Sequence, residues 1–66
     1  MGETLRTLRE RKNLTQKDVA QMIGVTPNTL RDWEKDSSKL KDYYTKKFMK
    51  IYDVEYDDIF LGKEHR

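Results

Sequence analysis

The chain has 66 residues, of which 35% are hydrophobic and 39% are charged, and its formal net charge is +2. A domain of about 60 residues buries only roughly 60% of its unfolded surface, so this length excludes a large two-lobed enzyme with an enclosed active site. The sequence contains no Cys, which excludes disulfides and Cys-ligated zinc as sources of stability. The chain must therefore fold by packing short elements together.

Helices are predicted throughout, because β-branched residues are scattered and no stretch alternates for long. The first helix covers about residues 4–12, with Leu5 and Leu8 on one face. Thr15 begins the second, since Asp18 follows three residues later as in a capping box. Gly24 suits the left-handed residue that closes this helix.

A third helix begins at Thr26-Pro27, with Thr as N-cap and Pro at the first helical position. It runs to about Lys35. A fourth helix is expected over about residues 41–52, and a short fifth over residues 56–61, ended by Gly62. The sequence therefore predicts an all-α fold, a compact five-helix bundle.

Residues 16–35 have the spacing of a helix-turn-helix formed by helices two and three. Ala20 is small where the two helices must approach closely. Gly24 stands where the chain must turn with positive φ, which costs other residues roughly 1 kcal/mol or more. Val25 and Leu30 fill the angle between the two helices.

Residues 14–26 read LTQKDVAQMIGVT, and Leu30, Trp33 and Glu34 follow in register. These residues match the signature LTQ-x-x-[LV]-A-x-x-[IL]-G-V-[ST] and the ending I-x-x-W-E of the phage-repressor-like helix-turn-helix proteins, which include lambda repressor, Cro and XRE-type regulators. The chain resembles this family over residues 3–62, leaving a charged tail of residues 63–66. The resemblance implies a five-helix DNA-binding domain. Asp36 departs from the family pattern, in which Gly is usual at this place.

The resemblance makes the third helix the recognition helix, and an α-helix fits the major groove of B-DNA. Asn28 can pair with adenine and Arg31 with guanine, while Asp32 can accept a hydrogen bond from a cytosine amino group. For Arg31 and Asp32 the alternative is plain solvated charge. The expected base contacts are Pro27, Asn28, Thr29, Arg31 and Asp32.

Phosphate contacts are expected around the same face, where helix-terminal amides and basic side chains attract the DNA backbone. In the family, the Gln that opens helix two contacts a phosphate and also braces the recognition helix. The resemblance further implies a structural ion pair between Arg9 and Glu34. The expected phosphate contacts are Gln16, Lys17, Lys35, Ser37, Ser38, Lys39 and Lys41.

Residues 43–60 contain six aromatic side chains, more than one small face can bury. Some of them are therefore expected at the surface as an apolar patch of the kind that marks an interface. Tyr56, Phe60 and Leu61 are the predicted homodimer contact.

The function predicted first is a cytoplasmic transcriptional regulator, a repressor, that binds double-stranded DNA as a homodimer. Its palindromic operator would place half-sites about one helical turn, roughly 34 Å, apart. A protein-interaction module, antitoxin-like or adaptor, is the alternative, with the helix-turn-helix as scaffold. An enzyme is the weakest reading, because no catalytic constellation is visible. No cofactor, metal, small-molecule ligand or membrane segment is expected, since His65 is the only His and no apolar stretch is long enough.

Overall fold

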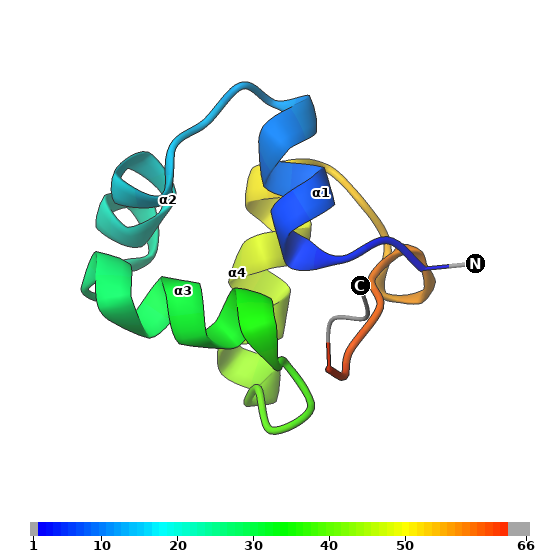
Figure 1. Cartoon of the computed structure of the whole chain (residues 1–66). Coiled ribbons are helices and arrows are strands. Elements are labelled where there is room, and N and C mark those ends of the chain that lie inside the picture. The colour runs from blue at the N-terminus through cyan, green and yellow to red at the C-terminus, as the bar shows by residue number, and fades with distance from the viewer. Residues whose placement is uncertain (1, 64–66) are drawn as a thin grey trace.

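The structure is a computed structural model that describes residues 2–63, and this part contains four α-helices and one 3-10 turn. The elements are α1 (Leu5–Arg11), α2 (Gln16–Ile23), α3 (Pro27–Lys35), α4 (Asp42–Tyr52) and η1 (Tyr56–Asp58) (Figure 1). Residues 2–63 hold no strand and only isolated β-bridges. The all-α prediction is confirmed, but the count of five helices is wrong, because the expected fifth helix is a single 3-10 turn.

Threonine side chains begin the first three helices. The hydroxyl oxygens of Thr4, Thr15 and Thr26 each accept a hydrogen bond from the backbone N–H three residues later. Thr15 also forms the predicted capping box, since Asp18 Oδ2 accepts from the Thr15 N–H at 3.0 Å. Such an N-cap stabilises a helix by about 1 kcal/mol. Thr4 and Lys12 are the N-cap and C-cap of α1 and lie outside the helix, so α1 is one residue shorter at each end than predicted.

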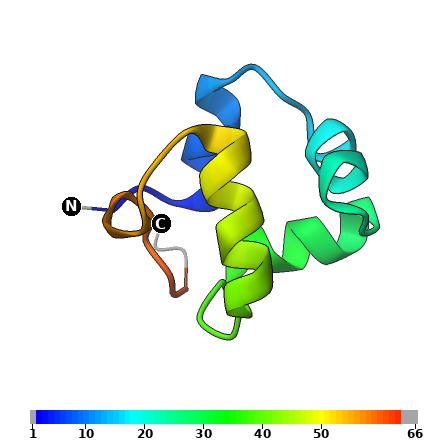
Figure 2. The ribbon, with the colours of Figure 1, turned by 180° about the vertical axis from the view of Figure 1, so that it is seen from behind.

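The core lies between α4 and the other helices, and Figure 2 shows α4 in front when the molecule is seen from behind. Phe48 is completely buried, and its ring stacks on Tyr52 with the centroids 5.7 Å apart. Trp33 covers the other side, with its ring 6.0 Å from Phe48 and 4.7 Å from Tyr44. Burying a side chain such as Phe48 contributes roughly 1.5–3 kcal/mol. The other buried apolar residues are Leu5, Leu8, Val19, Ala20, Ile23, Leu30 and Ile59.

The C-terminal segment leaves helical geometry after η1 because it pairs with the N-terminal segment. Ile59 is extended, with φ −104° and ψ 127°. The Phe60 N–H donates to Glu3 O at 2.8 Å, and the Glu3 N–H donates to Asp58 O at 2.9 Å. These groups would otherwise continue a helix. The extended backbone also turns the Ile59 side chain into the core, where it is 7% exposed.

The same segment closes onto the loop after α3. The Ser37 N–H donates to Gly62 O at 3.0 Å, and the Gly62 N–H donates back to Ser37 Oγ at 3.0 Å. Asp36, which replaces the usual Gly of the family, has φ −153°. This is ordinary extended backbone, so the position does not require glycine.

Candidate nucleic-acid interface

The turn between α2 and α3 has the geometry of a helix-turn-helix. Gly24 has φ +92°, and its N–H donates to Ala20 O at 2.8 Å. The Val25 N–H reaches the same carbonyl at 2.9 Å. A Cβ added at Gly24 would meet no atom within 4 Å. Glycine is therefore required here by the left-handed backbone and not by a lack of space.

α3 presents a polar face to solvent. Among the predicted base contacts, Pro27, Asn28, Arg31 and Asp32 are exposed, whereas Thr29 is half-buried. The Thr29 hydroxyl lies 2.9 Å from the Thr26 hydroxyl, so it is held within the N-cap of α3. The opposite side of the helix is anchored by buried residues. The structure thus separates four exposed candidate readers from Thr29, whose hydroxyl already has a partner.

Glu34 fixes α3 from inside through two hydrogen-bonded neighbours. Arg9 donates from Nε to Glu34 Oε2 at 2.6 Å and from Nη2 to Oε1 at 3.2 Å. Gln16 Nε2 donates to Glu34 Oε1 at 2.9 Å. The structure therefore brings together the Arg9–Glu34 pair and the bracing Gln16 that the resemblance implies. Arg9, Gln16 and Glu34 are called the Glu34 cluster below.

The Glu34 cluster joins four segments of the chain in a buried setting. The Glu34 side chain is 3% exposed and that of Arg9 is 11% exposed. Arg9 also donates from Nη1 to Leu14 O at 2.9 Å, which ties in the loop between α1 and α2. The hydrogen bond to Glu34 raises the pKa of Arg9, so its positive charge is firmly held. Such a paired and hydrogen-bonded arrangement is what a buried charge requires.

Tyr52 lies near Arg9 and Glu34, but unlike these two side chains its phenol makes no hydrogen bond within residues 2–63. The Tyr52 hydroxyl is nevertheless buried. Burial, and secondly the nearby Glu34 carboxylate, raises the pKa of this phenol above its ordinary value. Tyr52 therefore stays neutral, and its stacked ring rather than its hydroxyl accounts for its place in the core.

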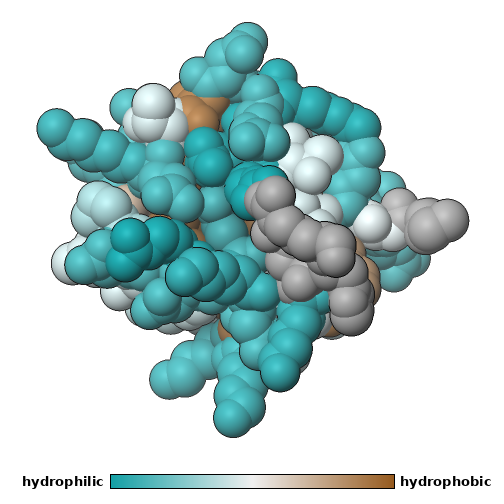
Figure 3. All heavy atoms as spheres, viewed as in Figure 1, coloured by the Kyte–Doolittle hydropathy of each residue, from teal (hydrophilic) through white to brown (hydrophobic). Residues whose placement is uncertain are grey.

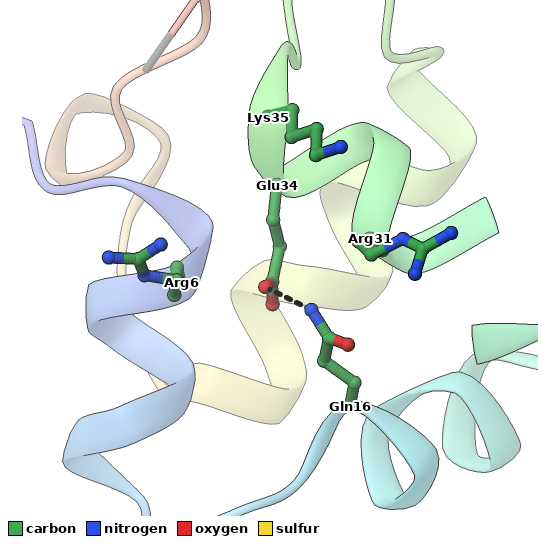
Figure 4. A pocket seen from close by; sticks show the side chains of 5 residues that line it. All are labelled: Arg6, Gln16, Arg31, Glu34 and Lys35. Carbon is green, nitrogen blue, oxygen red and sulfur yellow. Dashed lines mark hydrogen bonds between the residues drawn. The ribbon is translucent and has the colours of Figure 1, made fainter. Parts of the chain in front are cut away.

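A shallow hollow opens above the Glu34 cluster, between α1, α3 and the start of α2 (Figure 4). Its rim carries three cationic side chains, Arg6 from α1 and Arg31 and Lys35 from α3, around the Gln16 amide. Because Arg9 already compensates Glu34, the hollow has a positive surplus. Cationic side chains beside a helix N-terminus are the groups that bind phosphate oxygens.

Arg6 is the residue of this hollow that the sequence analysis missed. It lies outside the helix-turn-helix motif, and its guanidinium Nε is 3.9 Å from Glu10 Oε2. The available signal was its spacing of three residues from Arg9, which places both on neighbouring positions of one helix face.

The other predicted phosphate contacts fall into two groups. Ser37 is only 4% exposed, and its hydroxyl accepts from the Gly62 N–H, so it is corrected from a phosphate contact to a structural residue. Gln16 is half-buried and already serves as a brace. The remaining candidates are exposed: Lys17, Lys35, Ser38, Lys39 and Lys41. The view in Figure 3 shows that the surface over α1, α2 and α3 is mostly hydrophilic.

The predicted dimer residues lie in and after η1. Tyr56 is 49% exposed and Phe60 is 38% exposed, large values for aromatic side chains. Leu61 is half-buried and packs partly against the core. These three residues do not belong to α3 or to the hollow, so they leave the polar face of α3 open.

The family comparison covers both the turn and the Glu34 cluster. A family model described as Helix-turn-helix matches residues 5–59. Comparison with curated proteins finds no similar sequence. Within residues 2–63, no helix is long and apolar enough to cross a membrane. The same residues contain no group of three or more His, Cys, Asp or Glu side chains placed to hold a metal ion.

Proposed function

Since the chain belongs to the XRE/lambda repressor-like helix-turn-helix family, a family of DNA-binding regulators, we propose that it is a sequence-specific transcriptional repressor. It acts in the cytoplasm on double-stranded DNA and needs no cofactor. Residues 3–62 form the DNA-binding unit and residues 63–66 a charged tail, of which residues 64–66 lie outside the described part.

The observation that carries this proposal is an exposed polar helix face on a rigid internal support. α3 holds Asn28, Arg31 and Asp32 in solvent, while Glu34 on its other side is bound by two partners. A helix held in this way can enter a major groove without reorganising its side-chain anchor. Asn28 then reads adenine and Asp32 accepts from cytosine, each contact discriminating by about 1–3 kcal/mol. Pro27 and Thr29 offer apolar contacts.

The DNA backbone is held on both sides of α3. The hollow of Arg6, Gln16 and Arg31 receives one phosphate, which makes Arg31 a backbone contact as well as a candidate base reader. Further phosphates meet exposed side chains before α3, at its end and after it, namely Lys17, Lys35, Ser38, Lys39 and Lys41. These contacts position the protein without conveying sequence, and they make affinity depend on salt.

The repressor works as a homodimer through Tyr56, Phe60 and Leu61. Two copies related by a two-fold axis read two half-sites of a palindromic operator, about 34 Å apart. The exposure of Tyr56 (49%) and Phe60 (38%) supports this contact, because apolar surface left in water favours association.

Selection of bound duplexes from a random pool tests this function directly. The expected result is a palindromic consensus, and binding to it should weaken steeply as salt rises. Recovery of no duplex at low salt from a folded sample would refute DNA recognition. A consensus without symmetry would instead refute the palindromic operator while leaving DNA recognition standing.

An interaction module is the second candidate, favoured by the charge of α3 itself. Arg31 and Lys35 are balanced by Asp32 and Glu34, so the helix is formally neutral and attracts DNA weakly. Under this alternative the chain captures a stoichiometric partner protein, and duplex DNA leaves that capture unchanged. Competition by the selected duplex, or failure to capture any protein, would speak against it.

A further inference from the structure

The outer surface of α4 carries a stripe of basic and aromatic side chains. Tyr43, Lys46, Lys47 and Lys50 line one hollow, and their spacing of three and four residues places them on one helix face. Tyr43 is 63% exposed. Lys47 lies over the Tyr43 ring, with Nζ 4.8 Å from the centroid, and also donates to Ile23 O. The helix α4 itself lies in front in Figure 2, whereas α3 passes in front of it in Figure 1.

An acidic turn follows α4 directly. Residues 53–58 contain four carboxylates and no basic residue, and all four are exposed: Asp53, Glu55, Asp57 and Asp58. Glu55 and Asp58 cap η1 with each other's backbone. Asp53 and Asp57 are left to face solvent. The acidic turn therefore offers at least two carboxylates for an external partner.

Tyr56 connects the two charged regions. It lines a hollow together with Asp42, Thr45 and Lys46 of α4, so its ring lies beside the α4 stripe. Asp57 is its chain neighbour on the acidic side. A half-exposed aromatic thus stands between a basic region and an acidic one on a continuous surface.

The charges of the α4 stripe and of the acidic turn do not pair with each other within the described part of one chain. Among residues 2–63, Lys46 and Lys50 form no ion pair, and neither do Asp53 and Asp57. A basic and an acidic patch on either side of one point are self-complementary, because a two-fold rotation about that point lays each on the other. A second copy of this chain carries charges that match both patches.

We propose that the α4 stripe of one copy docks on the acidic turn of a second copy, with Tyr56 at the centre. This inference rests on the proposed homodimer and not on DNA recognition. Two-fold pairing of Lys46 and Lys50 with Asp53 and Asp57 orients the aromatic contact and makes dimerisation depend on salt. The stripe contains none of the residues proposed above to contact DNA.

Sedimentation equilibrium without DNA, over a series of salt concentrations, tests the pairing by charge exchange. One variant is Lys46→Glu with Lys50→Glu. The other is Asp53→Asn with Asp57→Lys, where Asn is chosen because Asp53 has φ +55°. Each variant alone should dimerise about tenfold more weakly than the wild type at low salt. An equimolar mixture of the two should regain association.

Lys12→Glu with Lys17→Glu is the matched control, since it makes the same charge change on exposed positions elsewhere and should leave dimerisation unchanged. Circular dichroism establishes that each variant is folded. A wild type that stays monomeric at low salt would overturn the proposal. So would a dimer that tolerates both variants but is lost in Phe60→Ser, because the contact would then be apolar alone. Duplex selection reports on DNA recognition separately, so the two failures are distinguishable.

Discussion

The helix α3 is held by a charge pair in the interior, Arg9 with Glu34, whereas α4 leaves Lys46 and Lys50 in solvent. Glu34 is 3% exposed on the side chain and is bound by Arg9 and Gln16. Lys46 and Lys50 are exposed and form no ion pair within residues 2–63. A buried pair determines one geometry at the cost of desolvation, while exposed charges act weakly and respond to salt. The first arrangement suits recognition and the second suits reversible association.

Among these substitutions, loss of Glu34 should cause the largest loss of stability. Glu34→Ala leaves the partly buried Arg9 uncompensated, so the free energy of unfolding should fall by about 3 kcal/mol. Urea denaturation measures the change. Glu10→Ala is the control, because Glu10 pairs with Arg6 at an exposed position and should cost no more than about 1 kcal/mol.

Equal losses in the two variants would show that the Glu34 cluster contributes no more than a surface pair. If Glu34→Ala proves unfolded, Glu34→Gln provides the measurable case, since it removes the charge and keeps a hydrogen-bond acceptor. Its stability should lie between those of Glu34→Ala and the wild type.

Substitution of Asn28 should weaken discrimination without affecting the fold. Asn28→Ala removes an exposed side chain and should cost about 1–3 kcal/mol of preference at one base pair. Competition binding against single-base variants of the selected duplex measures this loss.

Two control variants separate base reading from general charge. Lys39→Ala should weaken binding to every duplex alike and lower the salt slope by about 1. Lys46→Glu, on the α4 face, should leave the base preference unchanged. If Asn28→Ala instead lost affinity equally for all duplexes, Asn28 would contact the DNA backbone and not a base.

A substitution at Gly24, in the turn between α2 and α3, should lower stability by a smaller amount, and this loss reports on backbone geometry alone. Gly24→Ala should lower the free energy of unfolding by about 1 kcal/mol, because the residue has positive φ and the added methyl meets no neighbour. Thermal unfolding measures the loss, and Gly24→Asn should recover part of it. A neutral Gly24→Ala would show that the turn can change its conformation.

Asp18 should give the smallest effect, as a dependence of stability on pH. The hydrogen bond from the Thr15 backbone lowers the pKa of Asp18 below its ordinary 3.8. Its folded-state pKa lies below the unfolded one, so its contribution is complete above about pH 4 and is lost as pH falls through the folded value. Urea denaturation of Asp18→Asn and the wild type at about pH 5 and about pH 3 should show a difference that narrows in acid. A constant difference would contradict this role of the carboxylate.

The sequence by itself determined α1 to α4, because their signals are local. Thr15 with Asp18, the Thr26-Pro27 start and Gly24 each act within one turn of the chain, and the structure has each of them. The expected ion pair of Arg9 with Glu34 came from the family pattern, since no local rule links residues so far apart.

Only the tertiary structure decided the conformation of the C-terminal segment and which residues line the rim of the hollow. Residues 59–61 were expected in a helix, but the backbone of Glu3 takes the hydrogen bonds at Asp58 and Phe60. Ser37 was expected on DNA, yet the returning chain covers it at Gly62. Arg6 joins Arg31 only because α1 packs near α3. Each outcome depends on contacts between segments distant in sequence, and propensities and caps carry no information about such contacts.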